Sequence, residues 1–172
     1  MSSNSHLWQI PKVELPESHL SKLQNNLEER LTIISSQFSD VRFATSLAAE
    51  DMAVTDGIAK SAKSIHIFTL LTGRLHAETV EMKKAVESHY GLSIEAVEPQ
   101  AQDIQAFIAQ HGLNGFYDSE EAKKNCCYVR KVKPLELSLN GADAWITGLR
   151  RSQSVTRNEL AFQELDEVRG IP

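Results

Sequence analysis

Two adjacent thiols in a basic segment are the most reactive feature of this sequence. Cys126 and Cys127 are its only cysteines, and they lie within the lysine- and arginine-rich run 123–131. Positive neighbours favour the thiolate form, and thiolates are ligands of Zn²⁺ and iron–sulfur clusters. Two neighbouring cysteines are too few for a disulfide framework and poorly placed to bond to each other. The pair indicates a metal or redox role, with two buried apolar side chains on a helix as the alternative.

A second candidate segment, rich in arginine and hydroxyl side chains, is GLRRSQSVTR at 148–157. Guanidinium groups and hydroxyls suit the oxygens of phosphate or sulfate, and here they gather in a chain whose net charge is −5. We expect an anion site, the alternative being a solvated loop paired with Glu159 and Glu164. The candidate residues are Arg150, Arg151, Gln153, Ser154 and Arg157.

Two further segments combine small residues with donors for an anion. SLAAED at 46–51 would begin a helix whose free N–H groups attract anions, although it lacks the GxxxxGK[ST] pattern; alternatively, Ser46 or Asp51 only caps that helix. In LLTGR at 70–74, Gly73 permits an unusual turn and Arg74 offers a fork for phosphate, the alternative being an ordinary solvated turn. The candidate ligand-binding residues are Ser46, Leu47, Ala48, Ala49, Glu50, Asp51, Thr72, Gly73 and Arg74.

The elements that position these segments alternate along the chain. Leucine and isoleucine recur at helical spacing from Leu20 to Ile34. Strand-like runs follow at 41–46, 64–70, 93–97 and 144–147, with helical patterns near 50–62, 75–90 and 101–110. This alternation predicts an α/β fold with a mostly parallel sheet and helices on both faces. Residues 115–140 break the alternation and are expected to form one or two short helices. Ligands of such sheets bind beyond the carboxyl ends of the strands, where the candidate loops begin.

The composition is that of one ordinary domain. The chain has 172 residues, 41% hydrophobic and 24% charged, which argues against global disorder and coiled coils. We expect an irregular lead-in at 1–18 and a single α/β domain at 19–172. The acidic balance argues against broad nucleic-acid binding. No apolar run approaches the roughly 20 residues of a membrane helix, and no leader pattern opens the chain, so we expect a cytoplasmic protein without membrane or nucleic-acid partners.

Four segments, in order across 40–170, resemble the assimilatory sulfonucleotide reductases. SLAAEDM resembles that family's phosphate loop, FTLLTGRLHAET its LDTGR signature, KKNCCYVRKVKPL its cysteine-pair segment and GLRRSQSVTR its arginine loop. The resemblance implies an adenine nucleotide α-hydrolase-like fold. The double cysteine is similar to that of members with a [4Fe-4S] cluster, which mostly use adenosine 5′-phosphosulfate (APS) rather than its 3′-phosphorylated form, PAPS. The implied activity is reduction of APS to sulfite and AMP, with thioredoxin as electron donor.

The resemblance also implies roles for single residues. Segments 46–51 and 72–74 would hold the nucleotide, and the arginine loop would face the phosphosulfate. Lys131 would act electrostatically between cluster and substrate, where the leaving phosphate gains charge in the transition state. Cys126 and Cys127 would supply two of the four cluster ligands.

The sequence departs from the family pattern at two places. Leu71 stands where the signature often has Asp, which removes an acceptor and a charge. No cysteine follows Cys127, so the family's second cysteine pair and its tail nucleophile are missing. We therefore expect a C-terminally truncated reductase that binds its substrate without being competent alone. An apolar surface left by the missing part would favour homo-oligomers.

Three alternative functions stay open at this point. One is a PAPS reductase. Another is an ATP-pyrophosphatase-type ligase, although SLAAEDM lacks the SGGxDS form typical of that group. The third is a non-catalytic remnant that binds adenine nucleotides or metal, with two cysteines from each chain forming a four-thiolate site across a dimer.

Overall fold

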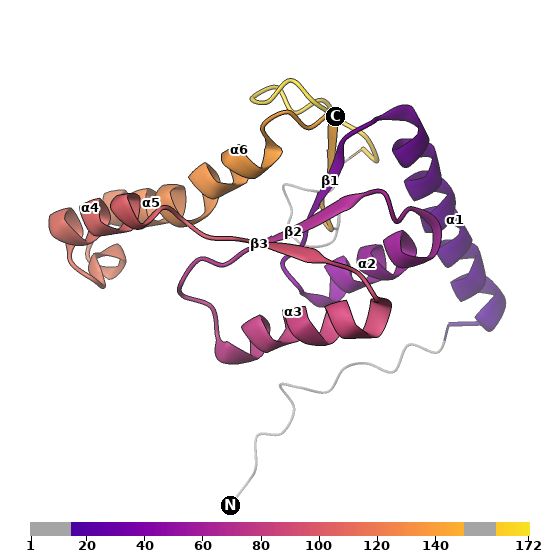
Figure 1. The fold of residues 1–172 in the computed structure, drawn as a ribbon, viewed down its shortest axis with the longest axis horizontal. Coiled ribbons are helices and arrows are strands. Elements are labelled where there is room, and N and C mark those ends of the chain that lie inside the picture. The colour runs from indigo at the N-terminus through magenta and orange to yellow at the C-terminus, as the bar shows by residue number, and fades with distance from the viewer. Residues whose placement is uncertain (1–14, 150–160) are drawn as a thin grey trace, which may run out of the picture.

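A parallel sheet organises the molecule. The computed structural model describes residues 15–149 and 161–172, and these form a four-stranded sheet in the order β3-β2-β1-β4 (Figure 1). The strands are β1 (Val41–Ala44), β2 (His66–Leu70), β3 (Ile94–Val97) and β4 (Ala144–Ile146). All pairings are parallel. Each strand falls inside its expected range, so the predicted α/β fold is confirmed.

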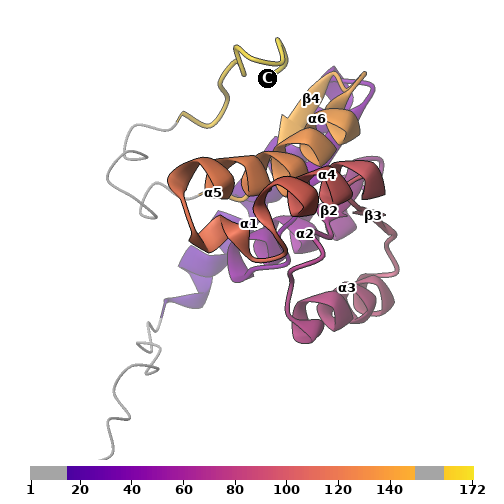
Figure 2. The ribbon, with the colours of Figure 1, turned by 90° about the vertical axis from the view of Figure 1, so that its left-hand side faces the viewer.

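Helices cover both faces of the sheet. The N-terminal helices α1 (Glu17–Gln37), α2 (Ala49–Ser61) and α3 (Ala77–Tyr90) gather on one side, with α1 packed on α2. Figures 1 and 2 place α6 (Lys133–Leu139) on the other side, where it contacts β2. Right-handed crossovers explain this division, because the chain moves outward from β1 to β3 and then returns past β1 to form β4.

The core lies between the sheet and the first two helices. Phe43, Ile67 and Ile94 from the strands pack with Leu31 and Ile58 from α1 and α2, all at most 2% exposed. Full burial of side chains of this size contributes about 1.5–3 kcal/mol each. Helix α1 begins at Glu17, inside the range expected to be an irregular lead-in. No helix in the described ranges is long and apolar enough to cross a membrane.

The return from β3 to β4 is an arm of helices beyond the strand ends. It contains α4 (Ala101–His111), a short 3₁₀ turn (Gly115–Tyr117) and α5 (Glu120–Cys127). A π-helical turn (Tyr128–Val132) then joins α5 to α6 without a break. The short helices expected at 115–140 are present as α5 and α6, of eight and seven residues, and the π turn joins them into one helical segment from 120 to 139.

Local chemistry explains this long segment. The Ser119 hydroxyl caps α5 by accepting the Ala122 N–H at 3.1 Å. Pro134 has no N–H for the carbonyl four residues before it, which would ordinarily break a helix. The π turn accommodates it: the Lys133 N–H donates to the Tyr128 carbonyl, five residues back. Such π turns often occur at functional sites, and this one directly follows the cysteine pair.

Candidate functional site at the carboxyl edge of the sheet

The sheet has a switch point between β1 and β4. The strands β2 and β3 lie on one side of β1 and β4 lies on the other, so the connections after β1 and β4 diverge and leave a crevice where α/β proteins bind ligands. Gly148 follows β4 and lies against α2: a Cβ at this position would be 1.8 Å from Asp51 Oδ1. The start of the arginine segment therefore packs on the first candidate loop. The predicted residues Arg150, Arg151, Gln153, Ser154 and Arg157 lie outside the described residues.

The loop after β1 is organised by one buried carboxylate. Asp51, 6% exposed, accepts the Ser46 backbone N–H at 2.6 Å and the Ser46 hydroxyl at 2.5 Å. Thr45 Oγ1 accepts the Leu47 N–H at 3.1 Å. Together these bonds hold Leu47 at φ +61°, a conformation that costs a non-glycine residue about 1–2 kcal/mol. The loop is thus held in a strained shape before any ligand binds.

Neither Ser46 nor Asp51 caps α2, so that alternative is wrong. The N-cap residue is Ala48, in extended conformation, and no side chain of the described residues caps the helix. Ala49, Glu50 and Asp51 form the first turn. The N–H groups at the start of a helix carry positive partial charge, while Glu50 and Asp51 in the first turn are acidic, so binding of a phosphate or sulfate group here stays a prediction.

A small hollow adjoins this loop on the side of α3. It measures about 270 Å³ and its wall includes backbone and side chains of Ser46, Leu47 and Ala48. The facing wall comes from α3, through Glu78, Thr79 and Met82. The candidate residues 46–48 therefore border an open space.

The loop after β2 is held from a distant part of the chain. Thr72 is buried, Gly73 has φ +70° and Arg130 Nη1 donates to the Thr72 carbonyl at 2.7 Å. The Arg130 guanidinium also occupies the space beside Gly73, where a Cβ would lie 3.2 Å from Nη1. Arg130 is 7% exposed. This contact between residues far apart in the sequence joins the π turn after the cysteine pair to the second candidate loop.

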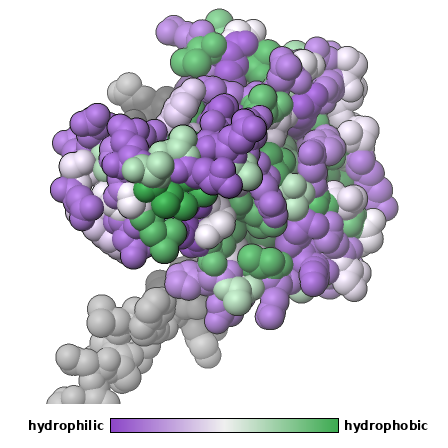
Figure 3. All heavy atoms as spheres, turned by 60° about the vertical axis from the view of Figure 1, so that its left-hand side comes forward, coloured by the Kyte–Doolittle hydropathy of each residue, from purple (hydrophilic) through white to green (hydrophobic). Residues whose placement is uncertain are grey.

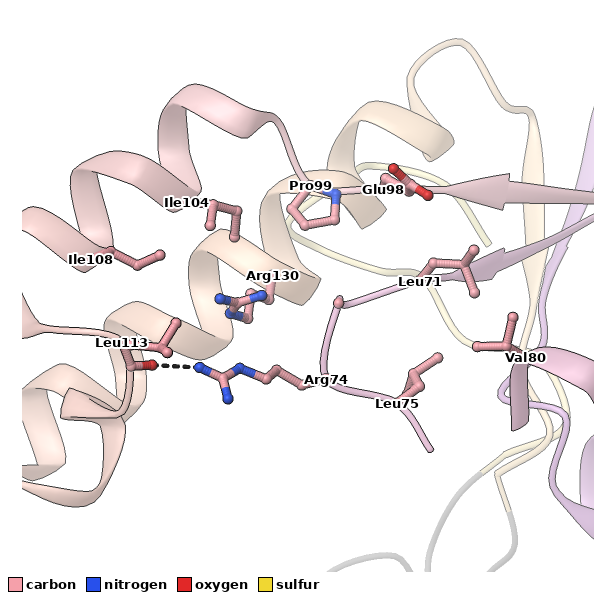
Figure 4. A pocket seen from close by; sticks show the side chains of 11 residues that line it. Leu71, Arg74, Leu75, Val80, Glu98, Pro99, Ile104, Ile108, Leu113 and Arg130 are labelled. Atoms are coloured by element: carbon pink, nitrogen blue, oxygen red, sulfur yellow. Dashed lines mark hydrogen bonds between the residues drawn. The ribbon is translucent and has the colours of Figure 1, made fainter. Parts of the chain in front are cut away.

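Arg74 extends toward the helical arm. Its Nη2 donates to the Leu113 carbonyl at 2.5 Å, and its guanidinium lies 5.3 Å from the centre of the Phe116 ring (Figure 4). Arg74 is therefore bonded within the protein, which differs from the solvated turn considered from the sequence. Binding of an anion by Arg74 stays a prediction, and the remaining N–H groups of the fork are the ones that would serve it.

A large cavity separates the second loop from α4. It measures about 780 Å³, and Figure 3 shows hydrophobic side chains gathered in a hollow at this end of the molecule, with polar ones around it. Leu71 belongs to the apolar wall, while its N–H donates to the Val97 carbonyl at 2.8 Å. The alkyl side chain at position 71 thus suits the apolar surface it lines. The cavity residues are Leu71, Gly73, Arg74, Leu75, Val80, Glu98, Pro99, Ile104, Ile108, Leu113 and Arg130.

The cysteine pair ends α5, directly before the π turn that contains Arg130. Cys126 is half-buried, Cys127 is exposed and both are free thiols. Lys131, within the π turn, is exposed. The Asn125 side-chain amide lies 3.2 Å from His111 Nε2, which ties α5 to α4. Within 15–149 and 161–172, no group of three or more His, Cys, Asp or Glu residues is placed to hold a metal ion.

Arg130 is the site residue that sequence reasoning missed. It appeared there only as one of several basic residues in 123–131. Its available signal was helical spacing: it follows Cys126 and Cys127 by four and three residues, which places it near their face of the helix. Nothing local could show that its partner is a carbonyl 58 residues earlier in the chain.

The fold defines an α/β domain whose candidate loops follow the carboxyl ends of its parallel strands. The chain belongs to the phosphoadenosine phosphosulfate reductase domain family, whose model matches residues 40–170. A Burkholderia cepacia protein named adenosine 5′-phosphosulfate reductase is 50% identical over 145 residues, which are 84% of this chain and 58% of that protein. A Neisseria meningitidis serogroup A protein of the same name is 46% identical over 167 residues, 96% of this chain and 68% of that protein.

A solved structure supports the fold. The phosphoadenylyl-sulfate (PAPS) reductase from Candida auris, solved as a phosphate complex, superposes with a TM-score of 0.70 at 20% identity, covering 92% of this chain and 78% of that one. The chain spans 58% of the length of the Burkholderia relative and 56% of that of an Allochromatium vinosum relative with the same name.

Proposed function

We propose that these residues form the nucleotide-binding part of an APS reductase, the enzyme that reduces adenosine 5′-phosphosulfate to sulfite and AMP in sulfate assimilation. The observation that carries the proposal is the bond from Arg130 to the Thr72 carbonyl. It brings the cysteine-pair helix to the second nucleotide loop, which is the juxtaposition a redox site beside a nucleotide requires. The names of the bacterial relatives support APS as substrate.

The reaction consists of two thiol steps. A thiolate attacks the sulfur of APS, the bond from sulfur to the phosphate oxygen breaks, AMP leaves and an S-sulfonated cysteine forms. A second thiol attacks the cysteine sulfur, which releases sulfite and leaves a disulfide. Thioredoxin is the proposed dithiol, and such reducing partners act in the cytoplasm. The part proposed for the described residues is to bind and orient APS.

Charge complementarity assigns roles at the edge of the sheet. APS is a polyanion, and the first turn of α2 offers helix N–H groups at the switch point. The arginine loop that begins after Gly148 would face the phosphosulfate, because its forks match phosphate and sulfate oxygens. Lys131 would stabilise the charge that develops on the leaving phosphate.

A [4Fe-4S] cluster fits the described residues only in part. Such a cluster takes four thiolates, and Cys126 and Cys127 at the end of α5 offer two, one half-buried and one exposed. The buried Arg130 Nε has no partner among the described residues, and an anionic cluster would suit that environment. We propose that the pair supplies two ligands of the cluster, which would tune the thiol chemistry nearby.

The test is an anaerobic calorimetric titration with APS, PAPS and ATP in parallel. We expect saturable binding of APS in preference to the other two. Lys131→Ala should weaken APS binding by up to about tenfold, because the phosphosulfate is already anionic before the reaction and a charge-assisted contact would be lost. Lys123→Ala serves as the matched control because Lys123 is another exposed lysine of the same segment. Tighter PAPS binding would move the substrate to PAPS. Preference for ATP would favour a ligase, and no binding by folded protein would contradict the proposal.

A further inference from the structure

Arg130 is buried in a way that needs a reason. It is 7% exposed, yet no carboxylate of the described residues pairs with it, and its Nε lacks any hydrogen-bond partner there. Burying a charge without a counter-charge is costly. A leucine or methionine would fill the same helical position at no such cost. The guanidinium therefore has a task that an apolar side chain cannot perform.

The contacts of Arg130 converge on one loop. Nη1 donates to the Thr72 carbonyl at 2.7 Å and lies beside Gly73, whose φ is +70°. The other bonds of the loop are few: the Leu71 N–H donates to the Val97 carbonyl at 2.8 Å, the Arg74 N–H donates to Thr72 Oγ1 at 3.3 Å, and the Arg74 side chain donates to the Leu113 carbonyl at 2.5 Å. Arg130 is thus the one side chain from another described element that bonds to the backbone of 72–74.

We propose that Arg130 is a positioning residue for the nucleotide loop. Its guanidinium holds the Thr72 carbonyl and the left-handed turn at Gly73, and it thereby sets the arrangement in which the loop receives an adenine nucleotide. Arg130 itself does not touch the nucleotide. The same side chain belongs to the helix of the cysteine pair, so a shift of that helix is passed to the loop through a single bond. The nucleotide part of this inference rests on the proposed function.

Two variants of Arg130 separate the effect of its positive charge from that of its guanidinium geometry. Arg130→Met keeps a long apolar stem and removes every donor, whereas Arg130→Lys keeps the charge and one possible bond to the Thr72 carbonyl. Lys133→Met is the matched control: Lys133 follows in the same helical segment and pairs with Asp103 at 2.6 Å, away from the loop. Each protein is titrated with AMP, and amide hydrogen exchange of 71–75 is followed without nucleotide.

We expect Arg130→Met to weaken AMP binding about tenfold or more, the loss typical of a hydrogen bond from a charged donor. Exchange should accelerate at 71–75 and stay unchanged in β1 and β2, because a local restraint is removed. Arg130→Lys should retain part of the AMP affinity and part of the exchange protection at 71–75. Lys133→Met should match the unmodified protein in both measurements.

Two results would overturn the inference. One is unchanged AMP affinity together with unchanged loop exchange in Arg130→Met. The other is a lower melting temperature with no local change at 71–75, which would make Arg130 a general stability residue. If the unmodified protein binds no AMP, the proposed function fails, and loop exchange alone decides: acceleration in Arg130→Met supports the positioning role and its absence contradicts it.

Discussion

The loops after β1 and β2 both meet the carboxyl edge of the sheet, but they are held in opposite ways. The first loop is closed from within, since Asp51 accepts both donors of Ser46 only five residues away. The second loop is held from outside, by Arg130 at a separation of 58 residues. Each carries one residue with positive φ, Leu47 in the first and Gly73 in the second.

This difference determines which loop changes when distant parts of the molecule move. A short-range carboxylate contact forms whenever α2 and β1 form, so the shape of the first loop is set locally. The second loop depends on the placement of the helical arm. Metal binding or oxidation at the cysteine pair would act on the second loop first, because the cysteines and Arg130 share one helical segment.

The strongest way to break the first loop is Gly148→Ala. The new methyl group would lie 1.8 Å from Asp51 Oδ1 and 3.3 Å from the Asp51 backbone nitrogen. We expect a loss of about 1–3 kcal/mol in the free energy of unfolding and weaker APS binding, measured by urea denaturation and calorimetry. Gly57→Ala is the comparison, because its new methyl group would meet only side-chain atoms, Leu31 Cδ1 at 2.7 Å and Leu27 Cδ2 at 3.3 Å, and the gain in helix propensity of about 1 kcal/mol offsets part of the crowding. Equal losses in the two variants would contradict the special packing of Gly148.

A smaller effect should follow from Asp51→Asn, which preserves shape but removes the charge. Both donors of Ser46 bond to the same oxygen, Asp51 Oδ2, so the amide can keep both bonds but loses the charged acceptor that strengthens them. We expect a loss of about 1–2 kcal/mol in urea denaturation. Asp56→Asn on the same helix breaks only the exposed pair with Lys60, a contact worth about 0.3–0.5 kcal/mol. If Asp51 closes the first loop, the loss in the free energy of unfolding is larger for Asp51→Asn than for Asp56→Asn. A larger loss for Asp56→Asn would contradict this role of Asp51.

The smallest effect is expected from the contact between position 73 and Arg130 in the second loop, isolated with Gly73→Ala. Its φ of +70° costs any alanine about 1–2 kcal/mol, and the Cβ would press on Arg130 Nη1 at 3.2 Å. Gly91→Ala has a similar φ of +63° with nothing within 4 Å, so the difference between the two unfolding free energies isolates the contact with Arg130. We expect that difference to disappear in the Arg130→Met background. A difference that persists there would locate the crowding elsewhere.

Most of the fold was predictable because its signals are local. Alternating apolar runs and helical spacing placed every strand and each helix that flanks them, and turn residues such as Gly91, the αL C-cap of α3, marked their ends. The segment 120–139 was harder. Pro134 is a strong breaker signal in the sequence, yet a π turn absorbs it, and π turns leave no pattern of their own.

The candidate site was predictable only as a set of loops. Parallel strands end at one edge, so segments 46–51, 72–74 and 148–157 could be grouped from the strand pattern alone. The sequence could not distinguish a capping Asp51 from one that closes the loop, because both roles use the same residue types at nearly the same spacing. The hydrogen bonds from Ser46 to Asp51 and the N-cap position of Ala48 decide it.

Sequence alone was sufficient to place the sheet, the candidate loops, the cysteine pair and the resemblance to a reductase family that the family model then matched. These follow from periodicity and residue chemistry, which act over a few positions. Only the tertiary structure decided that Arg130 holds the Thr72 carbonyl and that Gly148 rests on Asp51. Both contacts join segments far apart in the chain, and their geometry depends on how the helical arm and β4 pack against the same sheet edge.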